Sequence, residues 1–354
     1  MGNIYKELID KLQDNNIMVM ITKFLSNRVE KSLINLSKDS LSNINEEIKS
    51  VIDEVAEKKI PESFIYNNEE ILIEPFYPEA RLIIFGGGNI SEHLVDLGAK
   101  ADFKVTVVDD RLSYANKERF PLATEVICES YESVFDKIKV SKNDYVAIVT
   151  RGHKYDKDCL RAVLNIKPEY LGMIGSSRRV EGIKDQFIEE GYSKELLDEI
   201  SSPIGFRIGA ITPFEIAISI ISQIIAKKRL GVSDMIECAN AKKRTNYSDM
   251  DINVLENLAK EDNEKKAIVT VISTKGSTPR GPGAKMIVWE DGRILGSIGG
   301  GCSEGEVILA ARDLLDDGET GSFIKMQVDM TGDVAEDEGM VCGGIMNVLI
   351  ETLL

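Results

Sequence analysis

Along the middle of the chain, short runs of consecutive hydrophobic residues alternate with longer stretches in which hydrophobic residues recur at helical spacing. The short runs predict β-strands at 82–85, 105–108, 125–127, 145–149 and 170–174. The helical patterns include 131–140 and 156–165. Strands that are apolar throughout and alternate with helices are typical of a parallel sheet covered on both faces. We therefore expect an α/β domain in this part of the chain.

This α/β domain is expected to span residues 79–230. Its last helix has a well-marked start, because Thr212 can cap it, Pro213 suits the first helical position, and Glu215 completes a capping box. Residues 231–249 are polar and have no periodicity, which predicts a linker.

The two ends of the chain show the same order of predicted elements. In residues 250–354 the pattern predicts helices at 252–258 and 304–315, and strands at 267–273, 284–289, 294–298, 323–328 and 347–351. In residues 1–78 it predicts helices at 4–12 and 44–55, and strands at 17–22 and 71–74. The segments IMVMIT at 17–22 and ILIE at 71–74 parallel IVTVIS at 268–273 and VLIE at 348–351. We interpret both ends as α+β domains, the N-terminal one being a shorter, degenerate copy without the glycine-rich segments of the other.

A glycine-rich turn follows the first strand of the α/β domain. Gly86, Gly88 and Ser91 fit the pattern GxGxxG, with serine at the third position, where the residue only eases packing of helix on strand. The second strand ends at Asp109, where an acid would accept a hydrogen bond from a ribose hydroxyl. This arrangement predicts a Rossmann-type domain that binds NAD(P) or another nucleotide through Gly86, Gly88 and Asp109.

Two more loops follow strands of the same predicted sheet, at the edge where such sheets bind ligands. One carries Arg151 and His153, and the other carries Ser176 and Arg178. Guanidinium, hydroxyl and backbone N–H groups bind anionic oxygens, so all four residues are candidates for contacts with the ligand. His153 fits an ordinary polar loop residue equally well.

A second candidate site lies in the C-terminal domain, where Gly300, Gly301 and Cys302 join a predicted strand to a predicted helix. Ser303 and Glu306 have the spacing of a capping box, which would start the helix beside Cys302. The positive end of a helix favours the thiolate form of a cysteine.

Cys342 is a second cysteine on a glycine turn, and Arg280 lies on a loop stiffened by prolines. Thiolates bind soft metals or carry sulfur, and an arginine can hold phosphate. With Gly300, Gly301 and Cys302, these residues fit a site for a phosphorylated, metal-bearing or sulfur-accepting ligand. Small buried cysteines in tight turns explain the same residues, and the residue types alone do not decide between the two.

Charge and composition exclude several classes of protein. The formal net charge of −16 disfavours nucleic acid and anionic membranes as partners. No apolar run approaches the length of a membrane span, and the first 15 residues do not resemble a signal peptide. The five cysteines are an odd number without close spacing, as expected for reduced thiols, so we expect a cytoplasmic protein.

Several motifs, in order, resemble the xanthine dehydrogenase accessory family, also called the XdhC/CoxI family. The C-terminal motifs are GSTPRGPGAKMIV, GSIGGGCSEG and CGG, which contain Arg280, Cys302 and Cys342. The segments LIIFGGGNIS, VTVVDDR, IVTRGHKYD, YLGMIGSSRR and PIGFRIGAITPFEIAISI resemble the Rossmann domain of the family. In that family the cysteine domain precedes the Rossmann domain, whereas here the complete cysteine domain comes last.

The resemblance implies an accessory protein, a chaperone more than a turnover enzyme, that binds molybdenum cofactor as molybdopterin or its dinucleotide form. It implies that Cys302 and Cys342 contact the metal or receive sulfur, and that a molybdenum hydroxylase is the client. A cysteine desulfurase is an expected partner for sulfuration, and a homodimer is left open. Two alternatives remain: an NAD(P)-dependent oxidoreductase, which would show substrate-dependent hydride transfer, and a nucleotide-sensing regulator, which would bind nucleotide but no pterin.

Overall fold

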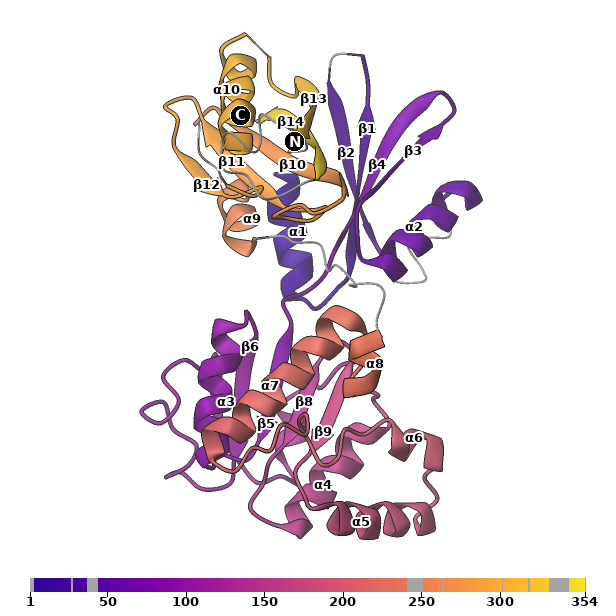
Figure 1. Cartoon of the computed structure of the whole chain (residues 1–354), viewed down its shortest axis with the longest axis vertical. Helices are drawn as coiled ribbons and strands as arrows, with labels where there is room; N and C mark the ends of the chain where they lie inside the picture. Colours follow the sequence, from indigo (N-terminus) through magenta and orange to yellow (C-terminus); the bar gives the residue numbers. More distant parts are fainter. Residues whose placement is uncertain are drawn as a thin grey trace. The chain divides into compact units, whose positions relative to one another are not determined.

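The computed structural model describes residues 3–26, 28–36, 44–240, 251–260, 262, 264–300, 302–317, 319–330 and 344–353 (Figure 1). The chain divides into two compact units. Unit 1 contains both ends of the chain, Met1–Pro78 and Asn246–Leu354, and unit 2 is Glu79–Thr245. The two terminal domains that the sequence predicts therefore belong to one unit. No helix among the described residues is long and apolar enough to cross a bilayer.

Unit 2 is built on a five-stranded parallel sheet with the order β7-β6-β5-β8-β9. The strands are β5 (Arg81–Phe85), β6 (Lys104–Asp109), β7 (Glu125–Cys128), β8 (Tyr145–Ile148) and β9 (Tyr170–Met173). The helices are α3 (Asn89–Lys100), α4 (His153–Leu164), α5 (Ser177–Glu189), α6 (Lys194–Asp198), α7 (Pro213–Leu230) and α8 (Met235–Asn240). This order confirms the predicted Rossmann-type α/β domain.

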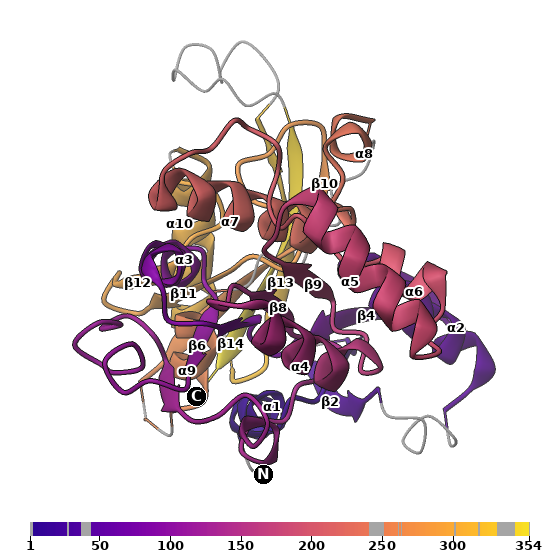
Figure 2. The ribbon, with the colours of Figure 1, turned by 90° about the horizontal axis from the view of Figure 1, so that it is seen from below.

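Alternate residues of the central strand, β5, pack into two separate hydrophobic cores. Leu82 and Ile84 pack in the core that holds buried residues of α3 and α7. Ile83 and Phe85 pack in the core that holds buried residues of α4 and α5. The two pairs of helices lie on opposite sides of the sheet (Figure 2). Because both faces are covered, the strands have no polar face, which explains their continuously apolar sequence.

Two predictions for this part of the chain need correction. Residues 131–140 do not form an α-helix but turns around a short 3₁₀ helix, η1 (Val134–Asp136). The apolar Tyr131, Val134 and Ile138 are nevertheless buried, because turns bring side chains three or four positions apart to one side as a helix does. The predicted linker contains α8, which is grouped with unit 2.

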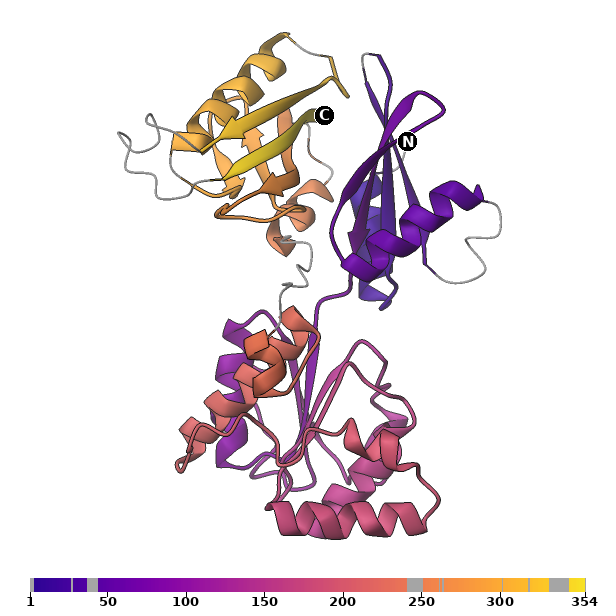
Figure 3. The same cartoon turned by 45° about the vertical axis from the view of Figure 1, so that its right-hand side comes forward.

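Unit 1 contains two antiparallel sheets, one from each end of the chain. The N-terminal elements are α1 (Ile4–Gln13), β1 (Met18–Phe24), β2 (Val29–Asn35), α2 (Glu46–Lys58), β3 (Glu62–Tyr66) and β4 (Glu69–Phe76). The C-terminal elements are α9 (Ile252–Leu258), β10 (Lys266–Lys275), β11 (Lys285–Trp289), β12 (Ile294–Gly296), α10 (Cys302–Asp317), β13 (Phe323–Asp329) and β14 (Ile345–Leu353). The sheet orders are β2-β1-β4-β3 and β12-β11-β10-β14-β13, so the topologies agree once β12 is set aside. A helix, α2 or α10, covers one face of each sheet (Figure 3).

The strand registers of the two copies also agree. Glu74 of β4 pairs with Met20 of β1, and Glu351 of β14 pairs with Ile268 of β10. This register makes Met20 equivalent to Ile268, three residues from the alignment of IMVMIT with IVTVIS. Both runs are mostly apolar and β-branched, so their sequences do not define which residues correspond.

The copies pack against each other through a shared core and a reciprocal pair of buried ion pairs. Lys285 Nζ lies 2.6 Å from Glu74 Oε1, and Lys31 Nζ lies 2.9 Å from Glu351 Oε1. Lys31 and Lys285 occupy equivalent positions, opposite Thr22 and Thr270, so each copy gives the other one ammonium and one carboxylate. In an isologous interface, the same two positions contact each other twice, once from each side. The two copies meet in this way within a single chain. The shared core contains Tyr5, Leu8, Leu12, Met18, Met20, Phe76, Val254, Leu255, Leu258, Ile268, Ile287 and Trp289.

Candidate functional site

The glycine loop between β12 and α10 is held in place by a single carboxylate. Oε1 of Glu304 accepts hydrogen bonds from the backbone N–H groups of Ile298, Gly299 and Gly300, at 2.8, 3.0 and 2.8 Å. It also accepts one from the Ser297 hydroxyl at 2.6 Å. The position of the loop is therefore fixed from the first turn of the helix that follows it.

Glu304 is buried, and its surroundings favour the charged form. Burial alone would raise the pKa of this carboxyl, but the hydrogen bonds from Ser297 and from the backbone of Gly300, Ile298 and Gly299 outweigh burial and lower it. Glu304 is therefore an anion at neutral pH. Its carboxylate occupies backbone N–H groups of the glycine loop that could otherwise bind a ligand.

Three loops meet at this point of unit 1. A Cβ on Gly299 would lie 2.3 Å from Cγ of Pro279, and a Cβ on Gly344 would lie 2.4 Å from the backbone oxygen of Ser277. The loop at 276–283 is therefore packed against both the glycine loop and the chain just before β14. Gly300 has a φ of 75°, and no heavy atom of the described residues lies within 4 Å of its Cβ position.

The structure describes only part of the predicted cysteine site. Arg280 is half-buried on the loop at 276–283, where its backbone oxygen accepts the Thr278 hydroxyl at 3.0 Å. Cys302 is the first residue of α10, and its side chain is outside the described part of the chain. Gly301 and Cys342 also lie outside the described residues. Gly299 and Gly344, which stand two positions from Gly301 and Cys342 in the sequence, are both packed against the loop of Arg280.

The predicted capping box at this helix needs correction. Because α10 begins at Cys302, Ser303 lies inside the first turn instead of preceding the helix. The exposed Glu306 is not the residue that reaches back to the loop; Glu304 is. A carboxylate within the first turn after a glycine run was the available signal, and sequence reasoning missed it.

In unit 2, the fingerprint glycines are required by close backbone approaches. A Cβ on Gly86, whose φ is 114°, would lie 2.4 Å from the Val149 oxygen, and one on Gly87 would lie 2.2 Å from the Tyr114 oxygen. Gly88 has no heavy atom within 4 Å of its Cβ position. Gly88 precedes α3, and no side chain caps this helix. Of the three glycines, Gly88 is therefore the one at which a phosphate could reach the backbone and the N-terminal end of the helix.

Asp109 has a different role from the predicted ribose contact. It is 1% exposed, and its carboxylate accepts hydrogen bonds from the Gly87 N–H at 2.8 Å and from the Arg111 N–H at 3.0 Å. The Arg111 guanidinium donates two more, at 2.8 and 3.0 Å. Burial acts to raise the pKa of Asp109, but these contacts lower it. Asp109 thus orders the glycine loop and is closed to a ribose.

The neighbouring Asp110 is the more accessible acid, and it binds Arg151. The two guanidinium nitrogens of Arg151 lie 2.6 and 2.9 Å from the Asp110 oxygens, and one also lies 3.0 Å from the Tyr155 hydroxyl. The ends of β6 and β8 are thereby joined. His153 begins α4, and its side chain is not described.

The third predicted loop lies at the start of α5. Ser176 precedes this helix without capping it, and Ser176 and Arg178 line a cavity of about 420 Å³ together with Lys157 and Gln186. Asp156, which sequence reasoning missed, accepts a hydrogen bond from Thr150 at 2.6 Å and pairs with Arg179. This buried carboxylate links the loop after β8 to the first turn of α5. Among the described residues, no three His, Cys, Asp or Glu side chains gather as metal ligands would.

Both parts of the chain match known families. Residues 82–224 match the XdhC Rossmann domain, and residues 259–327 match the XdhC and CoxI family. The chain is 29% identical over 163 residues to a probable xanthine dehydrogenase subunit of Bacillus subtilis (strain 168), covering 46% of this chain and 47% of that protein. It is 29% identical over 149 residues to protein YqeB of Escherichia coli (strain K12), covering 42% of this chain and 27% of that protein. The chain thus spans less than half the length of these relatives.

A solved structure of a xanthine dehydrogenase from Bacillus halodurans is similar with a TM-score of 0.40 and 20% identity, over 67% of this chain and 98% of that one. The two family matches contain the Gly86 fingerprint and the loop before Cys302, and together they cover more than half of the 354 residues. The chain therefore belongs to the XdhC and CoxI family.

Proposed function

We propose that this protein is an accessory factor for a xanthine dehydrogenase-type molybdenum hydroxylase, and that it holds molybdenum cofactor for delivery to that enzyme. Family membership and the name of the Bacillus subtilis relative support the accessory role. One observation carries the cofactor assignment: in unit 1 the glycine loop before Cys302 and the chain at Gly344 are both packed against the loop of Arg280.

The residues at this junction fit a phosphorylated, metal-bearing ligand. Arg280 supplies a guanidinium for an anionic group. Gly300 leaves open space where a larger residue would obstruct a ligand. The N–H groups of Ile298, Gly299 and Gly300 already donate hydrogen bonds to Glu304. The phosphate of the cofactor is therefore bound by Arg280 and by the N-terminal end of α10.

Cys302 and Cys342 are the proposed contacts to the metal or to the sulfur that it carries. Cys302 begins a helix of 16 residues, and the positive end of a helix favours a thiolate over a thiol. Thiolates are the ligands that soft metal centres prefer. When bound, the cofactor supplies the molybdenum centre that the client enzyme uses.

The other residues of the junction position these groups. Glu304 fixes the glycine loop, and with it the start of the helix that carries Cys302. The contact of Pro279 with Gly299 holds the Arg280 loop against that segment. A rigid support of this kind reduces the conformational entropy that the site loses when the ligand binds.

For unit 2 we propose nucleotide binding at Gly88 and the start of α3. NAD(P) and the nucleotide part of a dinucleotide cofactor are the candidates, and both bring a pyrophosphate. The open space at Gly88 and the uncapped helix support this assignment. The cysteine desulfurase and the homodimer that the resemblance implies stay predictions.

A transfer experiment tests the accessory role. The protein, purified anaerobically from a host that makes the cofactor, is incubated with a cofactor-free xanthine dehydrogenase, and the xanthine oxidation that appears is measured. The parent and a Cys128→Ser control should restore activity, because Cys128 is an exposed residue at the end of β7 in unit 2. A Cys302→Ser/Cys342→Ser variant should not. Equal restoration by all three proteins, or by none, would refute the proposal.

A further inference from the structure

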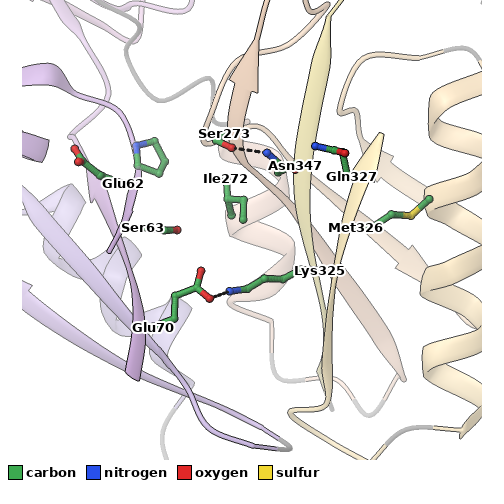
Figure 4. Close-up of a pocket in the computed structure, with 10 residues that line it drawn as sticks. Glu62, Ser63, Glu70, Ile272, Ser273, Lys325, Met326, Gln327 and Asn347 are labelled. Atoms are coloured by element: carbon green, nitrogen blue, oxygen red, sulfur yellow. Dashed lines mark hydrogen bonds and ion pairs between the residues drawn. The ribbon is translucent and has the colours of Figure 1, made fainter. Parts of the chain in front are cut away.

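The two copies in unit 1 form a cleft of about 570 Å³, and its lining includes none of the described residues of the cysteine-site loops (Figure 4). One wall comes from the N-terminal copy, with Ser63 of β3 and Glu70 of β4. The other wall comes from β10, β13 and β14 of the C-terminal copy. A volume of this size suits a small organic ligand. The residues that line the cleft are Pro61, Glu62, Ser63, Glu70, Ile272, Ser273, Lys325, Met326, Gln327 and Asn347.

The charges that face into the cleft balance each other. Glu70 and Lys325 point toward one another across it and form an ion pair (Figure 4). Lys325 Nζ also lies 3.6 Å from the centre of the Phe24 ring, which holds the ammonium against the wall. Glu62 also lines the cleft, and its carboxylate lies 3.5 Å from Lys58 Nζ. No surplus positive charge is left to attract a phosphate, so the cleft favours a neutral ligand.

Above this ion pair, Ser273, Asn347 and Gln327 lie in a row on neighbouring strands (Figure 4). Asn347 Nδ2 donates to the Ser273 hydroxyl at 2.9 Å, which leaves the Asn347 carbonyl as an acceptor. The Gln327 amide makes no hydrogen bond to the described residues, so it can both donate and accept. Carboxamides with this capacity recognise the edges of flat heterocycles through paired hydrogen bonds.

The row lies at the end of the sheet from which the cysteine-site loops emerge. Ser273 pairs with Asn347, and the pairing ends at Lys275 with Ile345. The chain continues from Lys275 into the loop of Arg280, while β14 begins directly after Gly344. A ligand in the cleft would therefore lie beside the loops that we assign to the metal-bearing end of the cofactor.

We propose that this cleft binds a neutral, flat heterocycle with an amino-pyrimidinone edge, which pterins and guanine share. The choice of ring rests on the proposed function, in which a pterin is the organic part of the cofactor. Gln327 and Asn347 bind the edge of the ring. The N-terminal copy, although it lacks the glycine-rich loops, supplies the wall that completes the site with Ser63 and Glu70.

The test uses the full chain and free pterin, whose fluorescence reports binding. The parent should bind pterin saturably, and Gln327→Leu and Asn347→Leu should each raise the Kd about tenfold or more, as the loss of a paired hydrogen bond does. Glu69→Gln is the matched control, because Glu69 adjoins Glu70 on the strand but is exposed and does not line the cleft. Gln327 is exposed, so its variant should melt at the parent's temperature, which checks that it is folded.

Two further titrations define the ligand. Guanosine competing with pterin would assign the cleft to the shared edge, whereas pterin binding without guanosine competition would assign it to the pterin ring. Inorganic phosphate should not compete. If the parent does not bind pterin, or if both Gln327→Leu and Asn347→Leu bind it as tightly as the parent, the proposal that this cleft binds the ring is refuted. If the Cys302→Ser/Cys342→Ser variant still loses molybdenum in that case, the proposed function survives without it; if the parent holds no molybdenum either, both proposals fail.

Discussion

The ion pair between Lys285 and Glu74 allows a quantitative test of how the two copies are joined. Both side chains are only 3% exposed, and Nζ and Oε1 are 2.6 Å apart. Lys285→Met removes the ammonium and leaves the carboxylate buried without its partner, which costs about 3–5 kcal/mol. This is a large part of the roughly 5–15 kcal/mol that stabilises a typical domain. Unit 1 of the variant should therefore unfold at a much lower urea concentration.

Replacing both charges should give a different result. In Glu74→Leu/Lys285→Met neither charge of this pair remains buried, and the hydrogen bond of Lys285 to Thr270 is lost at a cost of about 1 kcal/mol. We expect the double variant to lie within about 1–2 kcal/mol of the parent, well above either single variant. Lys31→Met, at the equivalent position of the other copy, should also destabilise, but somewhat less, because Lys31 is 10% exposed.

The fluorescence of Trp289 provides the assay. It is the only tryptophan of the chain, and it lies in the core that the two copies share. Its signal during urea unfolding therefore reports on unit 1. A cost of less than about 1 kcal/mol for Lys285→Met, or a double variant as unstable as the sum of the single ones, would show that this pair does not hold the copies together.

Three further predictions concern single side chains. Glu304→Gln keeps the shape but removes the charge that binds the glycine loop, so it should cost about 1–3 kcal/mol in Trp289-detected unfolding and speed hydrogen exchange at residues 298–300. Asp109→Asn should destabilise unit 2 by about 2–4 kcal/mol, measured by far-UV circular dichroism, and an unchanged midpoint would contradict its structural role. Burial, helped by Arg229, lowers the pKa of Lys228 from 10.5 to about 8. Stability should therefore rise with pH between these values, and Lys228→Met should gain about 1–2 kcal/mol at pH 7, a gain that disappears above pH 10.5.

The sequence predicted those parts of the fold that local rules determine. The inner strands β5 and β8 of unit 2 are buried on both faces and almost entirely apolar, so the sequence predicts them directly. The start of α7 was also predicted, because the Thr212 and Glu215 capping box is a local arrangement, and the structure contains it. The segment 131–140 was misassigned because turns can bury Val134 and Ile138 as well as a helix can.

The contacts that depend on distant parts of the chain could not be predicted. Asp109 and Asp110 are adjacent acids after a strand, and only the approach of Gly87 and Arg151 decides which one is buried. The sequence also does not indicate the pairing of Lys285 with Glu74, which are 211 residues apart. For the cysteine site, the motifs predict the segments that meet. The hydrogen bonds from the glycine loop to Glu304 are seen only in the structure.

The central claim is that the cysteine site of unit 1 holds molybdenum cofactor. The most direct measurement is the pterin and molybdenum content of the protein, purified anaerobically from a cofactor-producing host, beside Cys302→Ser/Cys342→Ser and the Cys128→Ser control. We predict nearly one pterin and one molybdenum per chain in the parent and the control, and a large loss of both in the double variant. Absence of pterin and molybdenum from the parent, even after incubation with free cofactor, would contradict the account.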